Sequence, residues 1–324
     1  MIAIADIEGA AKRLSGVAIE TPLVQNFELD RIAGGYVLLK PECLQRTGSF
    51  KIRGAYNLLS QLSAEQKKRG AVAWSSGNHA QGVAAAGGIL GMHTAIVMPE
   101  DAPAAKLDNT RRLGGEVILY DRYTGDREAI ARSIAAERGA EIVPSYEHPH
   151  IIAGQGTVGL EIAEQSMALG LPVDQVLICC GGGGLTSGSA IALRARLPEV
   201  VIYTVEPEHY DDTARSLASG ERMSVSTSAP SICDALLTDS PGAMTFDIMR
   251  RLVGGGLAVT EDEIKAAMRF AFRHLKLVVE PGGAAALAAV LAGKVDTSGK
   301  TTAVVLSGGN VDHELYASIQ GELI

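Results

Sequence analysis

The stretch QVLICCGGGGLTSG, Gln175–Gly188, joins a short apolar run to four consecutive glycines and the start of a helical pattern. The apolar run does not alternate with polar residues, which is typical of a strand covered on both faces, as in a parallel sheet. The glycines expose backbone N–H groups at a helix start, where the helix dipole favours a bound phosphate. A turn that only allows tight packing would also be glycine-rich. The stretch predicts a strand, a candidate phosphate-binding turn and a helix.

Similar apolar runs recur along the whole chain. They predict strands at Ala71–Trp74, Thr94–Met98, Val117–Tyr120, Gln175–Cys180, Val201–Val205 and Thr302–Leu306. Helical patterns lie between them, and two begin with capping boxes, at Ser63 with Gln66 and at Thr260 with Glu263. This alternation predicts an α/β fold with parallel sheets flanked by helices, divided into two lobes near residue 145.

The composition excludes several classes of protein. A net charge of −8 and an aromatic content of 4% argue against nucleic-acid partners, which need basic surfaces and stacking side chains. No run of about 18 apolar residues is present, so no membrane association is expected. The four cysteines form no C-x-x-C pair and the start of the chain lacks a signal-peptide pattern. We therefore expect buried thiols in a cytoplasmic protein.

Lys51 stands in TGSFKIRGA, Thr47–Ala55, a run of small residues that enters a helical pattern. A lysine is usually solvated at the surface. A lysine shielded from water has a lowered pKa and can form a Schiff base.

Two further motifs follow predicted strands. SSGNHAQG, Ser75–Gly82, offers hydroxyls, an amide and free N–H groups at a helix start, which suit a carboxylate but equally suit ordinary helix capping. SGGN, Ser307–Asn310, allows a flat ligand to approach the backbone, although a β-turn has the same composition. In a third motif, EPEHYDD, Glu206–Asp212, carboxylates could bind a hard divalent cation or form a solvated loop.

Taken together, the motifs resemble the serine/threonine dehydratase and serine racemase family, the tryptophan-synthase-β-like pyridoxal-phosphate enzymes of fold type II. The similarity extends from Thr21 to Asp312. It is specific in the order of six motifs: SFKIRGA, SSGNHAQG, AGQGT at Ala153–Thr157, GGGGL, EPG at Glu280–Gly282, and SGGN. The resemblance implies a large cofactor-binding domain of residues 1–60 and 148–324 and a small substrate-side domain of residues 61–147. It also implies a homodimer.

The resemblance implies a role for each motif toward pyridoxal 5′-phosphate. Lys51 would bond the cofactor covalently, Phe50 would pack near its ring, and Asn78 would bond its 3′-oxygen. Ser307 would face the ring nitrogen. The phosphate cradle would be Gly181, Gly182, Gly183, Gly184 and Leu185, and Glu280 would also bind the cofactor. A neutral hydroxyl at the ring nitrogen leaves it unprotonated, which suits β-elimination better than transamination.

The same resemblance implies the substrate and metal residues. Ser75, Ser76, Gly77 and His79 would hold the substrate carboxylate. Ser76 also matches the second acid/base of serine racemases. Glu206, the carbonyl of Tyr210 and Asp212 match a site for Mg²⁺ or Ca²⁺.

The expected activity is the dehydration and deamination of L-threonine or L-serine, small hydroxy amino acids, to 2-oxobutanoate or pyruvate and ammonia. Lys51 and Ser76 would be catalytic. Serine racemase and 3-hydroxyaspartate dehydratase are alternatives of the same class, and a non-catalytic nucleotide-binding regulatory protein is the alternative of another class.

A substrate with a second carboxylate would need a cation. Arg122, Arg127 and Arg132 are candidates between which the sequence does not choose. Glu147 would repel such a substrate, which favours serine and threonine.

Overall fold

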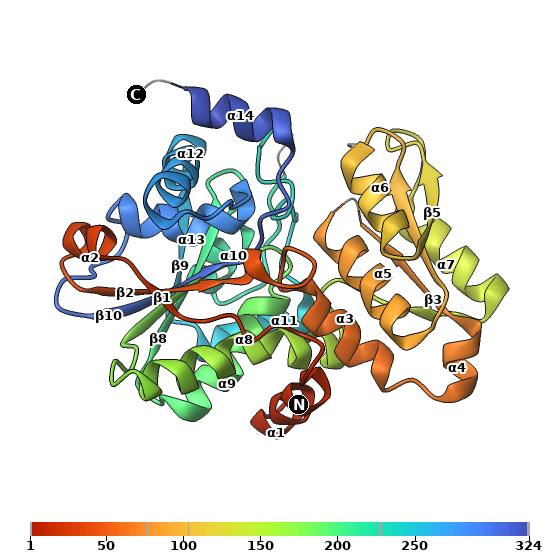
Figure 1. Ribbon diagram of the computed structural model, residues 1–324, viewed down its shortest axis with the longest axis horizontal. Helices are drawn as coiled ribbons and strands as arrows, with labels where there is room; N and C mark the ends of the chain where they lie inside the picture. The colour runs from red at the N-terminus through yellow and green to blue at the C-terminus, as the bar shows by residue number, and fades with distance from the viewer. Residues whose placement is uncertain (1, 76, 103, 227–228, 323–324) are drawn as a thin grey trace.

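The computed structural model describes residues 2–75, 77–102, 104–226 and 229–322. Strands and helices alternate along most of the chain (Figure 1). The strands are β1 (Val24–Gln25), β2 (Tyr36–Pro41), β3 (Ala71–Trp74), β4 (Thr94–Pro99), β5 (Gly115–Tyr120), β6 (Glu141–Ile142), β7 (Gln175–Cys179), β8 (Val201–Pro207), β9 (Gly255–Val259) and β10 (Thr301–Leu306). The first seven helices are α1 (Ile4–Leu14), α2 (Phe27–Ala33), α3 (Lys51–Ser60), α4 (Ala64–Arg69), α5 (Asn78–Leu90), α6 (Ala104–Arg112) and α7 (Arg127–Arg138). The others are α8 (Pro149–Ala168), α9 (Gly184–Arg196), α10 (Asp212–Ser219), α11 (Ala243–Leu252), α12 (Glu261–Phe270), α13 (Pro281–Leu291) and α14 (His313–Gly321), with a 3-10 turn η1 (Glu42–Leu44) and a π-helical turn η2 (Ala271–Leu275).

The strands form two sheets. The larger has the order β1-β2-β10-β7-β8-β9, and all its neighbouring strands are parallel except β1 and β2. The smaller has four parallel strands in the order β5-β4-β3-β6. Figure 1 shows two lobes, with α5, α6 and α7 around the smaller sheet and α3 between the lobes. The predicted α/β class, with parallel sheets flanked by helices in two lobes, is confirmed.

All six strands predicted from apolar runs are present, with ends shifted by at most two residues. The strands of the smaller sheet lie between residues 71 and 142, and those of the larger sheet come from residues 24–41 and 175–306. Each sheet therefore draws its strands from one of the two predicted domains. The domain boundaries, at residues 60/61 and 147/148, stay a prediction. No helix in the described ranges is long and apolar enough to cross a membrane.

Strand β7 shows how the larger sheet is buried. Leu177 and Cys179 point into a core shared with α12 and α13, whereas Val176 and Ile178 point into a core shared with α8 and α9. Successive side chains of a strand face opposite sides, so both faces of β7 are covered, which favours the apolar residues found along most of its length.

Helices α8 and α9 pack with their backbones in contact. A Cβ atom on Gly156 of α8 would lie 2.7 Å from the carbonyl oxygen of Gly188 on α9, and one on Gly159 would lie 2.6 Å from the Ser189 backbone. Side chains at these positions would push the helices apart. This packing fixes the start of α9 at the carboxyl end of β7.

A buried network of charges anchors α3 to the larger lobe. The Arg53 guanidinium donates two hydrogen bonds of 2.8 Å to the Glu42 carboxylate and others to Glu161 on α8. Lys40 of β2 pairs with Glu161 at 2.6 Å. Arg53 is 1% exposed, and Lys40 and Glu42 are fully buried. The network joins β2, η1, α3 and α8.

We expect Arg53→Met to destabilise the protein by about 3–5 kcal/mol, because it leaves two carboxylates in a buried site without their main cation. Urea unfolding followed by circular dichroism measures the change. Arg31→Met is the control, because it removes only an exposed pair with Glu28 and should leave the free energy of unfolding nearly unchanged. Equal shifts of the two variants would show that the buried network does not anchor the lobe.

Candidate active site

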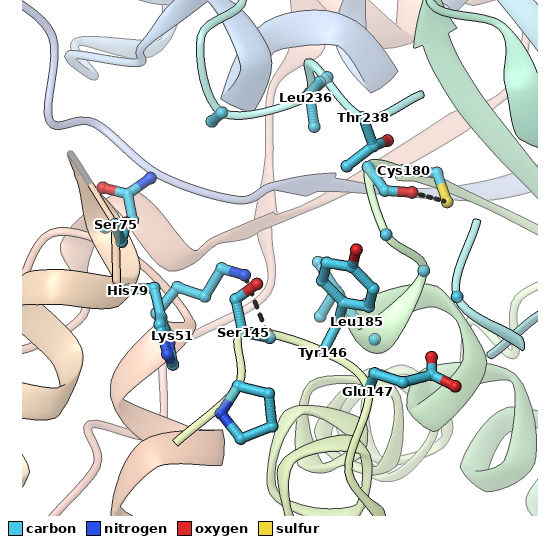
Figure 2. A pocket seen from close by; sticks show the side chains of 18 of the residues that line it. Lys51, Ser75, His79, Ser145, Tyr146, Glu147, Cys180, Leu185, Leu236 and Thr238 are labelled. Carbon is cyan, nitrogen blue, oxygen red and sulfur yellow. Dashed lines mark hydrogen bonds between the residues drawn. The ribbon is translucent and has the colours of Figure 1, made fainter. Parts of the chain in front are cut away.

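A cavity of about 770 Å³ lies where strands β3, β7 and β10 end, and both lobes line it (Figure 2). In open α/β folds, ligands bind at such carboxyl ends of strands. Its wall contains the described residues predicted to bind cofactor or substrate: Phe50, Lys51, Ser75, Gly77, Asn78, His79, Gly181, Gly182, Gly183, Gly184, Leu185, Glu280 and Ser307. Ser76 lies outside the described residues.

Lys51 is the first residue of α3, and its side chain reaches into the cavity (Figure 2). Its Nζ donates a hydrogen bond of 3.2 Å to the carbonyl oxygen of Ser145 and lies 5.1 Å from the centre of the Phe50 ring. Burial lowers the pKa of the Lys51 amine to about 8. The amine therefore loses its proton far more readily than an ordinary lysine, and its uncharged form is nucleophilic.

The loop before Lys51 is tied to the SGGN motif. The Phe50 N–H donates to the Ser307 carbonyl at 3.2 Å, and Ser49 forms an antiparallel bridge with Gly308. Gly48 has a φ of 70°, and a Cβ there would lie 2.5 Å from the Asn310 side-chain oxygen. Only glycine fits this position. These contacts place the lysine and Ser307 in the same cavity.

The tetraglycine turn is closed on three sides. A Cβ on Gly182 would lie 2.3 Å from the Tyr146 ring, and one on Gly184 would lie 2.5 Å from the Gln155 side-chain oxygen. Gly183 has a φ of 91° and packs against Met249. The turn thus presents backbone to the cavity at the start of α9, an arrangement that suits a phosphate.

Ser307 and Glu280 lie at the carboxyl end of the larger sheet. The Ser307 hydroxyl oxygen accepts a hydrogen bond of 3.0 Å from the Cys179 thiol. Burial raises the pKa of the Glu280 carboxyl to about 7, and its oxygen accepts from the Asn78 amide at 2.6 Å. The Asn78 oxygen in turn accepts from the Asn310 amide at 2.8 Å. Asn78 is therefore oriented by neighbours on both sides.

His79 is a neutral side chain. Its Nε2 lies 2.8 Å from the Val143 carbonyl oxygen. A carbonyl only accepts hydrogen bonds, so Nε2 carries the ring proton. Burial, with the Lys51 charge, lowers the pKa of the imidazole to about 3, so Nδ1 carries no proton. The His79 ring therefore has no N–H left to donate to a substrate carboxylate. Its predicted role in holding that carboxylate fits only through its backbone N–H.

Three arginines were candidates for a second substrate carboxylate. Arg127 begins α7, lines the cavity and has no hydrogen-bond or ion-pair partner in the part of the chain that the structure describes. Arg132 lines the cavity but pairs with Glu128, and Arg122 pairs with Asp101 outside the wall. Arg127 is thus the one of these three with a free guanidinium in the cavity.

Glu147 was expected to repel a dicarboxylate. Its Oε1 accepts a hydrogen bond of 2.6 Å from the Met244 N–H at the start of α11. The positive end of that helix dipole offsets part of the carboxylate's charge, so the repulsion is weaker than the sequence suggested.

The cavity wall also contains residues that sequence reasoning did not select. Tyr146 packs on the tetraglycine turn, and Lys106 and Asp234 line the wall from different lobes. Tyr146 stands beside the predicted lobe boundary, in a region that carries no motif, and Lys106 stands in an ordinary helical pattern. Their positions depend on how the lobes meet, which no local pattern encodes.

The acidic cluster lies outside the cavity wall. The Glu206 carboxylate at the end of β8 accepts from the N–H groups of Thr213 and Ala214 at 2.9 and 2.8 Å. Asp212 is buried, and neither of its carboxylate oxygens has a hydrogen-bond partner among the described residues. Burial, with the charge of Asp212, raises the pKa of Glu206 to about 8, and burial raises that of Asp212 to about 7. In the described ranges no group of three or more His, Cys, Asp or Glu side chains could hold a metal ion, so a site here needs backbone oxygen as well.

Known proteins resemble the chain over nearly its full length. Residues 14–308 match the family model described as pyridoxal-phosphate dependent enzyme. The chain is 45% identical to an L-threo-3-hydroxyaspartate ammonia-lyase of Pseudomonas sp, over 97% of this chain and 97% of that one. It is 38% identical to the catabolic L-threonine dehydratase of Escherichia coli K12, over 99% and 96% of the two chains. Its structure is similar to that of maize serine racemase, with a TM-score of 0.92, 35% identity, and 98% and 97% of the two chains covered.

The cavity fits the cofactor that this family uses. The buried Lys51 amine of lowered pKa suits the cofactor's aldehyde, and the glycine backbone at the start of α9 suits its phosphate. The neutral hydroxyl of Ser307 suits its ring nitrogen. The alternative of a non-catalytic nucleotide-binding protein is therefore wrong. The chain belongs to the pyridoxal-phosphate dependent enzymes, as the order of its motifs predicted.

Proposed function

We propose that this enzyme removes the β-hydroxyl and amino groups of L-threonine or L-serine, giving a 2-oxo acid and ammonia. The observation that carries the proposal is the Lys51 amine, with a pKa of about 8, in one cavity with the neutral hydroxyl of Ser307. The relatives named as dehydratases and ammonia-lyases support the same reaction class.

Pyridoxal phosphate, when bound, supplies the carbon that an amine attacks and a ring that takes up electrons from the Cα–H bond. Lys51, Phe50, Asn78, Glu280, Ser307 and the backbone of Gly181–Leu185 would hold it. The Ser307 hydroxyl carries no charge, so it favours an unprotonated ring nitrogen and a reaction in which electrons leave with the β-oxygen.

The chain supplies the base and the binding groups. Lys51 is placed to take the Cα proton at its Nζ, because the Ser145 carbonyl holds that atom at the cavity wall. Ser75, Gly77 and the backbone of His79 would hold the substrate carboxylate at the start of α5. Ser76 would join them and serve as a second acid/base for racemisation, but it lies outside the described residues and this role stays a prediction. So do the homodimer and the cytoplasmic location.

A second candidate substrate is 3-hydroxyaspartate. It is favoured by the guanidinium of Arg127, which lines the cavity without a partner in the described ranges, and by the Glu147 carboxylate, which accepts a hydrogen bond at the start of α11. The name of the Pseudomonas relative supports it as well. A serine racemase activity is compatible with the same site and is supported by the similarity to maize serine racemase, but no contact of a described residue favours it.

We also propose a divalent-cation site, for Mg²⁺ or Ca²⁺, at Glu206, Asp212 and the carbonyl of Tyr210. The proposal is supported by buried Asp212, whose two carboxylate oxygens have no hydrogen-bond partner among the described residues, and by the second buried carboxylate of Glu206. All-oxygen donors suit these hard ions. The ion would order the segment between β8 and α10.

The first test concerns substrate and base. We expect the wild-type protein to release 2-oxobutanoate from L-threonine or pyruvate from L-serine, measured by a coupled dehydrogenase assay. Lys51→Ala should abolish release, because it removes the base and the covalent attachment. Wild-type protein that acts on neither amino acid would contradict the proposal.

The same assay separates the two substrates. Arg127→Met should raise KM for L-threo-3-hydroxyaspartate by roughly tenfold to a hundredfold if the guanidinium binds its second carboxylate, and should leave KM for threonine unchanged. Arg132→Met, which removes a cation already paired, is the control. An unchanged KM for hydroxyaspartate in the Arg127 variant would remove the support for that substrate.

The second test concerns the Lys51 amine. Covalent loading of apoenzyme with pyridoxal phosphate needs the uncharged amine, so its rate should rise with pH and level off above about 8. Stopped-flow absorbance between pH 6 and 10 measures it. Free lysine, with an ordinary pKa of about 10.4, gives the reference curve. A loading rate that follows the free-lysine curve would show that burial does not activate Lys51.

The third test concerns the acidic cluster. A carboxyl whose folded-state pKa is raised stabilises the protein below its unfolded pKa and loses that contribution as pH rises through the folded value. The folded-state pKa is about 8 for Glu206 and about 7 for Asp212, so EDTA-treated protein should lose stability between about pH 5 and 8. Mg²⁺ or Ca²⁺ at a hundred times Kd should restore about 2.7 kcal/mol of stability at pH 8. It should restore little at pH 5, where both carboxyls are protonated and do not bind the ion. Melting temperatures with NaCl as control measure this, and the same response in Asp212→Ala would refute the site.

A further inference from the structure

One ion pair joins the two lobes at the cavity. Lys106 lies on α6, beside the smaller sheet, and Asp234 lies in the segment between α10 and α11 of the larger lobe. The Lys106 Nζ is 2.5 Å from the Asp234 Oδ2. Both residues line the cavity, and the Lys106 side chain is only 14% exposed. An ammonium shielded in this way keeps more of its electrostatic reach than a surface charge.

The ammonium lies beside the start of α5. The Lys106 Nζ is 3.9 Å from the point that a Cβ on Gly77 would occupy, and Gly77 is the N-cap of α5. The first-turn N–H groups of a helix have no partners within it, and the helix dipole places positive charge there. Ser75, whose hydroxyl accepts from the Gly77 N–H at 3.2 Å, lies on the same side of the cavity as Lys51 and His79 (Figure 2).

The charges around this point favour one more anion. His79 is uncharged near neutral pH, because burial lowers the pKa of its imidazole to about 3. The Glu280 carboxyl accepts a hydrogen bond from the Asn78 amide, and burial disfavours its ionised form. Asp234 is the carboxylate that contacts the ammonium, and it approaches from the other lobe. The start of α5 and the Lys106 ammonium therefore lie close together, and Asp234 is the carboxylate that contacts the ammonium.

We propose that Lys106 binds the α-carboxylate of the amino-acid substrate, with Asp234 holding its ammonium in place from the opposite lobe. This inference rests on the proposed function only in taking the substrate to be an amino acid. Neutral donors at the start of α5 orient the carboxylate, and Lys106 supplies the charge that selects it. The substrate carboxylate then connects the two lobes through one side chain.

The test uses the holoenzyme and a ligand without a leaving group. L-Alanine and L-alaninamide both carry an amine that displaces Lys51 and changes the cofactor absorbance, but only L-alanine has a carboxylate. We expect Lys106→Met to raise the apparent Kd of L-alanine by roughly tenfold to a hundredfold and to leave that of L-alaninamide within about twofold of wild type. Lys106→Arg should recover part of the loss.

Two further variants complete the experiment. Lys68→Met removes an exposed lysine paired with Glu65 on the same lobe and should change neither Kd. Asp234→Asn should raise the apparent Kd of L-alanine less than Lys106→Met does. The double variant should bind L-alanine no more weakly than Lys106→Met alone, because Asp234 acts through Lys106.

Each outcome decides the proposal. An unchanged Kd for L-alanine in Lys106→Met overturns it, and so does an equal loss for both ligands, which would make the ion pair a contact between lobes only. Melting temperature and cofactor absorbance of each variant verify that it is folded and loaded. Because L-alanine has no β-hydroxyl to eliminate, these results are independent of whether threonine or serine is a substrate.

Discussion

The position of Lys51 depends on the buried charges two residues further along α3. Arg53 contacts two carboxylates that come from η1 and α8, and both contacts use paired hydrogen bonds. Buried charges are stable only with such geometry, and alternative packings of α3 would leave at least one of them without a partner. The network therefore specifies one orientation of the helix, and Lys51, at its first turn, takes its direction from it.

The smaller lobe is positioned on the same helix. A Cβ on Gly82 of α5 would lie 3.0 Å from the Lys51 backbone, and one on Gly154 of α8 would lie 2.4 Å from the Arg53 carbonyl oxygen. Glycines thus let α5 and α8 contact α3 on two sides without intervening side chains. One short helix carries the reactive amine, joins the charge network and separates the lobes, so a shift of α3 would alter the cavity from several directions at once.

The sequence predicts the parts of this structure that are local. Apolar runs located six strands. The other four were missed because β1 and β6 have only two residues each, β9 begins with two glycines, and the short apolar run of β2 is followed at once by Lys40 and Pro41. Likewise, glycine motifs and Lys51 could be found because each carries its own signal. The sequence does not reveal the roles of Lys106, Asp234 and Tyr146. These side chains meet their partners only where distant segments of the chain, or segments of different lobes, come together.

Burial divides the cavity into an uncharged part and a charged part. It lowers the pKa of Lys51 and of His79 and raises that of Glu280, so near neutral pH these groups carry less charge than the same side chains in water. The guanidinium of Arg127 and the ion pair of Lys106 with Asp234 also line the wall. A base must be uncharged to accept a proton, whereas a group that orients a carboxylate must keep its charge. The two requirements conflict at a single position, and the cavity meets them by placing the groups apart.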